Sequence, residues 1–299
     1  MKKVVSVSLG SSDRDKVVEI TIFGEPFWIG RIGTDGSLKK AVKLIKSLDG
    51  KVDAIGLGGI DRYLVAGGKR YEIKQAKKMA LAAKKTPVVD GSGLKHSLEP
   101  YVLNYLEEQR ILEFKGKKVL LVSAVDRFGM AETFPRLGCE VIYGDLIFAL
   151  GIPVGIFSLR SLKILAKIFL PILCWLPISL LYPTGTKQKR QKPKGKKFFE
   201  WADIIAGDFH FIRRYIPERL DGKVIITNTI TQEDVEFLKN KGVKLLVTTT
   251  PDLEGRSFGT NVVEGVLVAL VGAERPLTSA EYLREIQRIG WKPKIEKLN

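Results

Sequence analysis

Lys95 and two aspartates upstream of it have side chains suited to acid–base chemistry. Lys95 lies in the segment DGSGLKHS, which begins at Asp90 and separates a predicted strand from a predicted helix. Loops in this position often face the cleft of a two-domain α/β protein. Lys95 could relay a proton if burial and a neighbour lower its pKa, with Asp90 or Asp61 orienting it. The alternative is a loop that leads into the helix, with Ser97 as its N-cap and Lys95 on the surface.

A second group of polar side chains follows the strand predicted at 203–206. Asp208 and His210 would project near the carboxyl edge of a parallel sheet, where ligands bind in such folds. Arg213 and Arg214 could clamp a carboxylate or a phosphate. We therefore predict a catalytic role for His210 and substrate or anion binding for the two arginines. The alternative is a polar loop with one structural histidine between core phenylalanines.

The strand predicted at 119–122 leads into a turn where a dinucleotide-binding fold has its glycine-rich loop. Ala124, Asp126 and Gly129 occupy the three glycine positions, so only the last glycine is present. Asp145 follows the next strand, where a ribose-binding acid belongs, and no basic residue beside it would hold a 2′-phosphate. We predict NAD as cofactor, with NADP as the alternative; the competing interpretation is a Rossmann-like sheet that binds no dinucleotide. The predicted cofactor contacts are Ser123, Asp126, Gly129 and Asp145, together with Asn228 and Thr248 at the ends of later strands.

The end of the strand predicted at 245–249 and the start of the helix at 261–270 form a further candidate anion site. Hydroxyl groups and free amide groups at that helix N-terminus could hold an anion, with Arg256 beside them. Ordinary turn and cap chemistry is the alternative explanation.

Strands and helices alternate along the chain, which predicts an α/β fold of two domains. Residues 1–113 form the expected substrate domain, and residues 114–299 form a Rossmann-like domain with a parallel sheet. In the first domain, strands are predicted at 4–9, 17–23, 27–32, 52–57 and 87–89, and helices at 38–48, 73–83 and 98–106. In the second, strands are predicted at 119–122, 141–143, 203–206, 224–227 and 245–249, and helices at 129–137, 233–240 and 261–270.

An insertion at 146–199 sets this chain apart from an ordinary α/β protein. It contains ten Lys or Arg and no Asp or Glu, and it is apolar up to residue 182 and strongly basic at 187–197. Pro171 and Pro177 predict a bent helical hairpin. The insertion could be a lid over the cleft, a contact with an anionic membrane surface, or the interface of a homodimer with a solvated basic loop.

Charge and composition limit the classes of partner. Outside the insertion, 39 Lys or Arg face 33 Asp or Glu, so the positive charge is local and no nucleic-acid partner is expected. Cys139 and Cys174 alone make neither a disulfide scaffold nor a metal site. The N-terminal residues lack the apolar region of a signal peptide, and the uncharged run 168–182 is too short to span a bilayer. A cytoplasmic protein is expected, either free or bound at the membrane surface.

Seven segments spread over nearly the whole chain carry a family resemblance. The segments are VVSVSLGSS at 4–12, GLGGIDRYL at 56–64, VVDGSGLKHSLE at 88–99, VLLVSAVDRFGMAE at 119–132, GDLIFALGIP at 144–153, IIAGDFHFIRRYIP at 204–217 and TTTPDLEGRSFGTNV at 248–262. Together they resemble a family of bacterial proteins grouped under the name quinate/shikimate 5-dehydrogenase.

The resemblance implies an NAD(P)-dependent oxidoreductase that acts on a hydroxyl or carbonyl group of a small molecule, with a lysine and an aspartate of the substrate domain beside the reacting hydroxyl. The chain lacks the N-V-T-x-P-x-K motif and the G-A-G-G-A turn of authentic shikimate dehydrogenases. The alternative is a non-enzymatic peripheral membrane or interaction protein that kept the fold.

Overall fold

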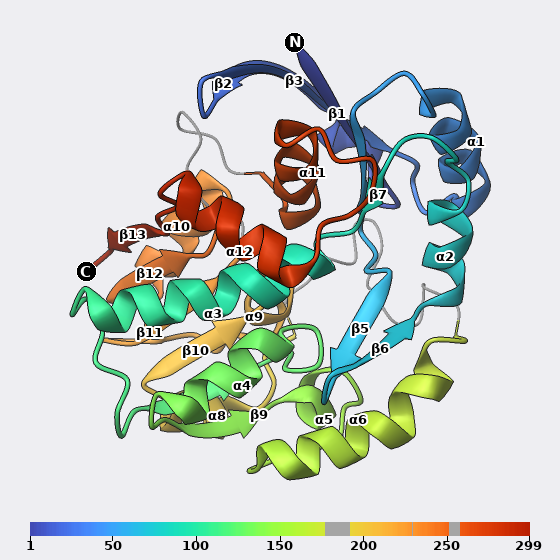
Figure 1. Cartoon of the computed structure of the whole chain (residues 1–299). Coiled ribbons are helices and arrows are strands. Elements are labelled where there is room, and N and C mark those ends of the chain that lie inside the picture. The colour runs from blue at the N-terminus through green and yellow to red at the C-terminus, as the bar shows by residue number, and fades with distance from the viewer. Residues whose placement is uncertain (177–191, 229, 251–257) are drawn as a thin grey trace.

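The computed structural model describes residues 1–176, 192–228, 230–250 and 258–299. The described residues form a mixed α/β fold with two separate main sheets, one in each half of the chain (Figure 1). The predicted fold class is confirmed, because both main sheets are largely parallel and are covered by helices.

The first sheet has five strands in the order β2-β3-β1-β4-β7. β3 pairs with β1 in parallel and with β2 in an antiparallel hairpin. The hairpin has a two-residue turn at Phe23 and Gly24, which have φ angles of 52° and 83°. The elements of this half are β1 (Lys2–Ser8), η1 (Ser12–Arg14), β2 (Lys16–Ile22), β3 (Glu25–Gly33), α1 (Leu38–Leu48), β4 (Ala54–Gly58), α2 (Lys74–Ala80) and β7 (Val88–Val89).

The second sheet has six strands in the order β13-β12-β11-β10-β8-β9, and β13 alone runs antiparallel to its neighbour. Its parallel strands are short apolar runs that are buried on both faces, as expected for a sheet between two layers of helices. The elements of this half are β8 (Lys118–Leu121), α4 (Phe128–Arg136), β9 (Glu140–Tyr143), β10 (Ile204–Gly207), α9 (Phe209–Tyr215), β11 (Val224–Thr227), α10 (Gln232–Asn240), β12 (Leu245–Thr248) and β13 (Lys294–Lys297).

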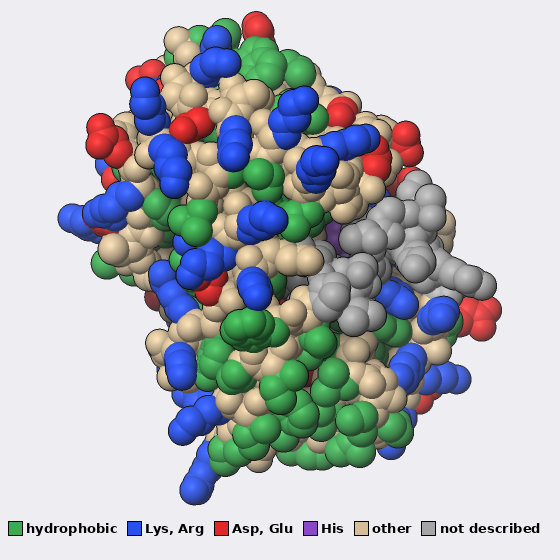
Figure 2. All heavy atoms as spheres, turned by 90° about the vertical axis from the view of Figure 1, so that its right-hand side faces the viewer, with side chains coloured by type: hydrophobic (Ala, Val, Ile, Leu, Met, Phe, Trp, Pro, Cys, Tyr) green, Lys and Arg blue, Asp and Glu red, His purple; other side chains and the backbone are tan. Residues whose placement is uncertain are grey.

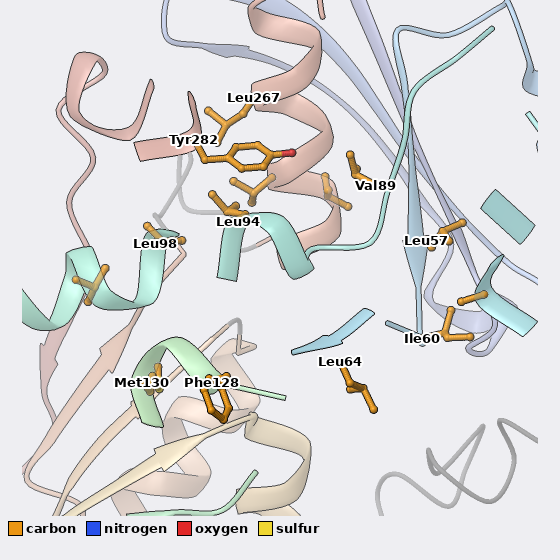
Figure 3. Packing of buried hydrophobic residues seen from close by; sticks show 14 of the residues in the cluster. Leu57, Ile60, Leu64, Val89, Leu94, Leu98, Phe128, Met130, Leu267 and Tyr282 are labelled. Atoms are coloured by element: carbon orange, nitrogen blue, oxygen red, sulfur yellow. The ribbon is translucent and has the colours of Figure 1, made fainter. Parts of the chain in front are cut away.

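Three helices join the two sheets. α3 (Ser92–Glu108) packs against α4 and against α12 (Ser279–Arg288). α11 (Thr260–Leu270) packs on β1 and β4, so the chain returns to the first sheet near its end, although the sequence placed this helix with the second domain. Figure 3 shows residues of one hydrophobic core cluster, which includes Leu57 of β4, Leu267 of α11, Leu94 of α3 and Phe128 of α4. The two halves therefore share a core.

Several elements were missed or misplaced by sequence reasoning. The hairpin of β5 (Tyr63–Ala66) and β6 (Lys69–Glu72) was not predicted, and α3 begins at Ser92 instead of 98. Within the insertion, the helix-spaced leucines form α6 (Leu159–Leu173), which contains Pro171. The second arm of the predicted helical hairpin falls on 177–191, outside the described residues. Two short helices, α5 (Asp145–Phe148) and α8 (Lys196–Trp201), flank the insertion.

Candidate functional site

Lys95 is buried where the two sheets meet, with its ammonium group held between two carboxylates. Its Nζ lies 2.8 Å from Oδ1 of Asp61 and 2.8 Å from Oδ1 of Asp126. Asp61 follows β4 of the first sheet, and Asp126 follows β8 of the second. Lys95 itself is on the first turns of α3, so the predicted loop with Ser97 as N-cap is wrong. The structure thus brings Lys95 and Asp61 together and adds Asp126, which the sequence assigned to cofactor binding.

Arg127 is a second buried cation beside Asp126. Its guanidinium group lies within 2.9 Å of Asp208 and 3.1 Å of Asp126, and it also pairs with Glu99, one helical turn after Lys95. Arg127 is 1% exposed, and sequence reasoning assigned roles to neither it nor Glu99. No sequence pattern predicts that an arginine is buried, so Arg127 could not be found in this way. Glu99 could have been found, because it is four residues from Lys95 and a helix beginning at Ser92 places the two on one face.

The charges of this cluster do not balance, which shifts the pKa values of its members. Two cations face four carboxyl groups in a region from which water is largely excluded. Burial, and the nearby Asp126 carboxylate, raise the pKa of Asp61 to about 8 against the opposing effect of Lys95. Lys95 and Arg127 hold the pKa of Asp126 well below its usual range despite its burial. At neutral pH, Asp61 therefore keeps its proton, and burial raises the pKa of Glu99 as well.

Burial acts to lower the pKa of Lys95, but the Asp126 carboxylate, and Asp61 when it is ionised, outweigh burial and raise this pKa. The lowered pKa that a proton relay by Lys95 would require is therefore absent, because a lysine between two carboxyl groups is stabilised in its charged form. Lys95 remains an ammonium group at neutral pH and can donate hydrogen bonds. Asp61 has the pKa that allows proton exchange near neutral pH.

Asp90, the other predicted partner of Lys95, holds backbone segments together. Its Oδ2 accepts hydrogen bonds from the amide groups of Arg62 and Tyr63, at the start of the β5–β6 hairpin. Its Oδ1 accepts bonds from the amide and the hydroxyl of Ser92, where α3 begins. Asp90 lines the cleft, but it has no ion pair with Lys95.

The turn after β8 matches a dinucleotide site only in part. Asp145 lies just after β9, as the sequence predicts for a ribose-binding acid, and burial raises its pKa to about 6. Its two carboxylate oxygens accept hydrogen bonds from the amide groups of Ala124 and Val125, at 3.1 Å and 3.0 Å. In dinucleotide-binding proteins, amide groups of this turn normally bind the pyrophosphate. Here Asp145 already accepts their hydrogen bonds.

Gly129 has a packing role between two helices. A Cβ atom at this position would lie 3.0 Å from Cδ of Pro100 on α3. The glycine allows α4 to approach α3 closely, and no ligand is needed to explain it. Ser123 lies in the same turn, and its Oγ accepts a hydrogen bond from the amide of Asp208 at 3.2 Å.

The remaining predicted residues are distributed around the cleft. His210 is exposed and lines it, and Arg213 lines it while pairing with Glu233 and Asp234 of α10. Arg214 also lines the cleft, and its Nε has no hydrogen-bond partner among the described residues. The side-chain amide of Asn228 donates a hydrogen bond to Asp208. Thr248 is buried, and its hydroxyl donates to the Thr250 carbonyl. Arg256 lies outside the described residues.

The cleft between the sheets has a volume of about 510 Å³, and most of its lining residues are charged or polar. Lys95, Asp61 and Asp126 lie in its wall, beside the carboxyl ends of strands from both sheets. A smaller chamber of about 140 Å³ adjoins it, and the two cavities share Asp126 and Phe211. The chamber is lined mostly by apolar side chains, six of them from α6, with Ser123 and Asp145 among its few polar residues. The insertion thus closes an apolar space next to the charged cluster.

Comparison with family models places the chain in a family. Residues 93–298 match the model of a family described as a domain of unknown function (DUF8754), and residues 3–90 match a second model (DUF8753). The chain therefore belongs to the DUF8754 family. The two matches meet at the start of α3, whereas the sequence placed the domain boundary after residue 113. No curated protein matches the sequence.

Solved structures with a related arrangement include two dehydrogenases and a malic enzyme. A glutamate dehydrogenase is 12% identical with a TM-score of 0.42 over 89% of this chain and 63% of its own. The hetero-hexameric glutamate dehydrogenase of Thermus thermophilus, in its Leu-bound form, is 12% identical with a TM-score of 0.44 over 97% and 73%. The malic enzyme of Entamoeba histolytica is 11% identical with a TM-score of 0.43 over 99% and 65%. The chain thus spans less than two thirds of the first and third of these proteins.

Proposed function

We propose that the chain is an oxidoreductase that acts on a hydroxyl or carbonyl group of a small molecule bound in the cleft. One observation carries this proposal: the Lys95 ammonium group lies between Asp61 and Asp126 in the wall of a cleft lined by many charged residues. Oxidation of a hydroxyl group requires a base for its proton, and reduction of a carbonyl group requires an acid. A positioned Lys–Asp pair at this place can supply both.

The pKa shifts indicate different roles for Lys95 and Asp61 in the proposed reaction. Lys95 stays charged and would donate a hydrogen bond to the substrate oxygen, which stabilises negative charge that develops on it. Asp61, with a pKa of about 8, would take up or release the substrate proton near neutral pH. Asp126 holds Lys95 in place and is itself paired with Arg127. Arg214 lines the same cleft and would contact an anionic group of the substrate.

NAD is the hydride carrier in this proposal, with NADP as the alternative. When bound, the nicotinamide ring supplies the hydride acceptor or donor. The Rossmann-like sheet and the position of Asp145 after β9 support this choice. The turn after β8 and Asp145 fit the ribose better than the pyrophosphate. The amide groups of Ala124 and Val125, which would bind the pyrophosphate, already donate hydrogen bonds to Asp145. Binding of a dinucleotide would require Asp145 to release at least one of them.

The test is a spectrophotometric assay of NAD and NADP reduction with a panel of polar and apolar alcohols. Lys95→Met and Asp61→Asn are each expected to lower kcat by about 10²- to 10⁴-fold. Lys78→Met, at an exposed lysine of α2, is the matched control and should leave the rate unchanged. Turnover that survives both cleft substitutions would remove Lys95 and Asp61 from the reaction.

A further inference from the structure

The exposed apolar side chains of this molecule are concentrated in one short segment. Of fifteen large hydrophobic side chains exposed in the described part of the chain, nine lie between residues 150 and 175. Phe157 is 71% exposed and Trp175 is 72% exposed. Figure 2 shows hydrophobic side chains gathered at the lower end of the molecule, the end at which Figure 1 places α6. An exposed apolar area of this kind usually marks a contact surface.

The helix α6 is apolar on two opposite faces. Its inner face, with Leu162, Ala166 and Leu170, is buried and lines the chamber beside the cleft. Its outer face repeats isoleucine every fourth residue, at 164, 168 and 172, and all three side chains are exposed. A surface helix of a globular protein normally carries polar residues on its outer face. The inner face is already packed, so the fold itself gives no reason for the outer isoleucines.

Charge indicates what covers this outer face. The whole insertion at 146–199 has ten Lys or Arg and no acidic residue. Arg160 and Lys167 are exposed on α6, and Nζ of Lys74 lies 4.2 Å from the centre of the Trp175 ring. An apolar face bordered by cations matches an anionic lipid surface. A symmetric dimer through this face would instead bring two acid-free cationic segments together.

We propose that the outer face of α6, together with the loop 150–157, docks on an anionic lipid bilayer. The isoleucines would enter the boundary between headgroups and acyl chains, with Trp175 at headgroup level and the cations against lipid phosphates. The helix would lie along the surface, since no helix in the described part of the chain is long and apolar enough to cross a membrane. This proposal goes beyond the proposed reaction and does not depend on it.

The experiment is co-sedimentation of the full chain with lipid vesicles in the absence of substrate. Binding is expected to vesicles of phosphatidylcholine with roughly a third phosphatidylserine, to weaken at high salt, and to be poor for phosphatidylcholine alone. The triple variant Ile164→Ser/Ile168→Ser/Ile172→Ser should lower the partition coefficient at least about tenfold. The variant Arg160→Gln/Lys167→Gln should weaken binding at low salt only.

A matched control uses three exposed hydrophobic residues elsewhere on the molecule. Val17→Ser/Leu81→Ser/Val271→Ser removes similar apolar surface away from α6 and should bind vesicles like the unmodified chain. Failure of the unmodified chain to bind anionic vesicles, or equal loss in both triple variants, would overturn the proposal. The proposal would also be overturned if vesicle binding is absent and sedimentation velocity shows a dimer that the α6 triple variant dissociates. A second copy of the chain would then cover this face.

Discussion

Lys95 on α3 and Asp126 after β8 form a buried ion pair of 2.8 Å at the place where the two sheets meet. The pair has one partner from each side of the cleft, and Asp61 completes it from the end of β4. Arg127 extends the cluster to Asp208 on the second sheet. The geometry that would serve catalysis therefore also fixes the two halves of the chain relative to each other.

Removing the Lys95 ammonium group should destabilise the fold. Lys95→Met leaves Asp61 and Asp126 buried without this cation, which should lower the free energy of unfolding by about 3–5 kcal/mol in urea titrations. Lys95→Met/Asp126→Asn removes one of the carboxylates as well and should recover part of that loss. Equal losses in the single and double variants would show that Lys95 and Asp126 are not energetically coupled.

The stability of the chain should depend on the ionisation of Asp61. Its folded-state pKa of about 8 lies above the ordinary value, so the folded state binds this proton more tightly than the unfolded state. The stabilisation is complete below about pH 4 and is lost as the pH rises through 8. In Asp61→Asn the pH dependence should become shallower by the contribution of this group, which thermal unfolding between these pH values can measure. A slope unchanged by the substitution would contradict the raised pKa.

Glu264 on α11 should show the same sign of pH dependence at a second site. Its Oε2 accepts a hydrogen bond from the amide of Gly91, and burial raises its pKa to about 7. Glu264→Gln keeps an acceptor without the charge, so it should be more stable than the unmodified chain above pH 7 and similar at pH 5. Glu281→Gln is the contrasting control: its pKa is lowered to about 2 by Arg275 and by the cap of α12, so this variant should be less stable at neutral pH.

Gly129→Ala tests whether this glycine serves packing. The new Cβ would meet Cδ of Pro100 at 3.0 Å, and we expect a loss of about 1–3 kcal/mol in the free energy of unfolding. Pro100→Ala in the same chain should relieve the contact. A double-mutant cycle in urea measures the coupling, and a coupling near zero would contradict close packing of α3 on α4 at this point.

The sequence predicts strands and helices well where apolar runs bounded by turns, or apolar residues at helical spacing, mark them directly. β11 (224–227) and α1 (38–48) fall at the predicted residues. Periodicity gave no signal for the β5–β6 hairpin, whose four-residue strands turn at Gly67 and Gly68. The return of α11 to the first sheet depends on contacts between residues far apart in sequence, such as Lys2 Nζ with the Ala269 carbonyl at 2.7 Å.

The candidate site was predictable in part. Lys95 and Asp61 were chosen for their residue types, and the structure places them in contact. The raised pKa of Lys95 could not be foreseen, because the sequence assigned Asp126 to a cofactor-binding turn and not to Lys95. Arg127 was missed because burial of a guanidinium group depends on three carboxylates from separate segments, which no local pattern reveals.

The most direct measurement is a calorimetric titration of the purified chain with NAD, NADH, NADP and NADPH. The oxidoreductase account predicts binding of at least one of them, weakened in Asp145→Ala and also in Asp145→Asn, with both variants folded by circular dichroism. Lys78→Met should bind like the unmodified chain. If none of the four binds, the amide groups of Ala124 and Val125 stay with Asp145, and the proposed role of a nicotinamide cofactor is contradicted.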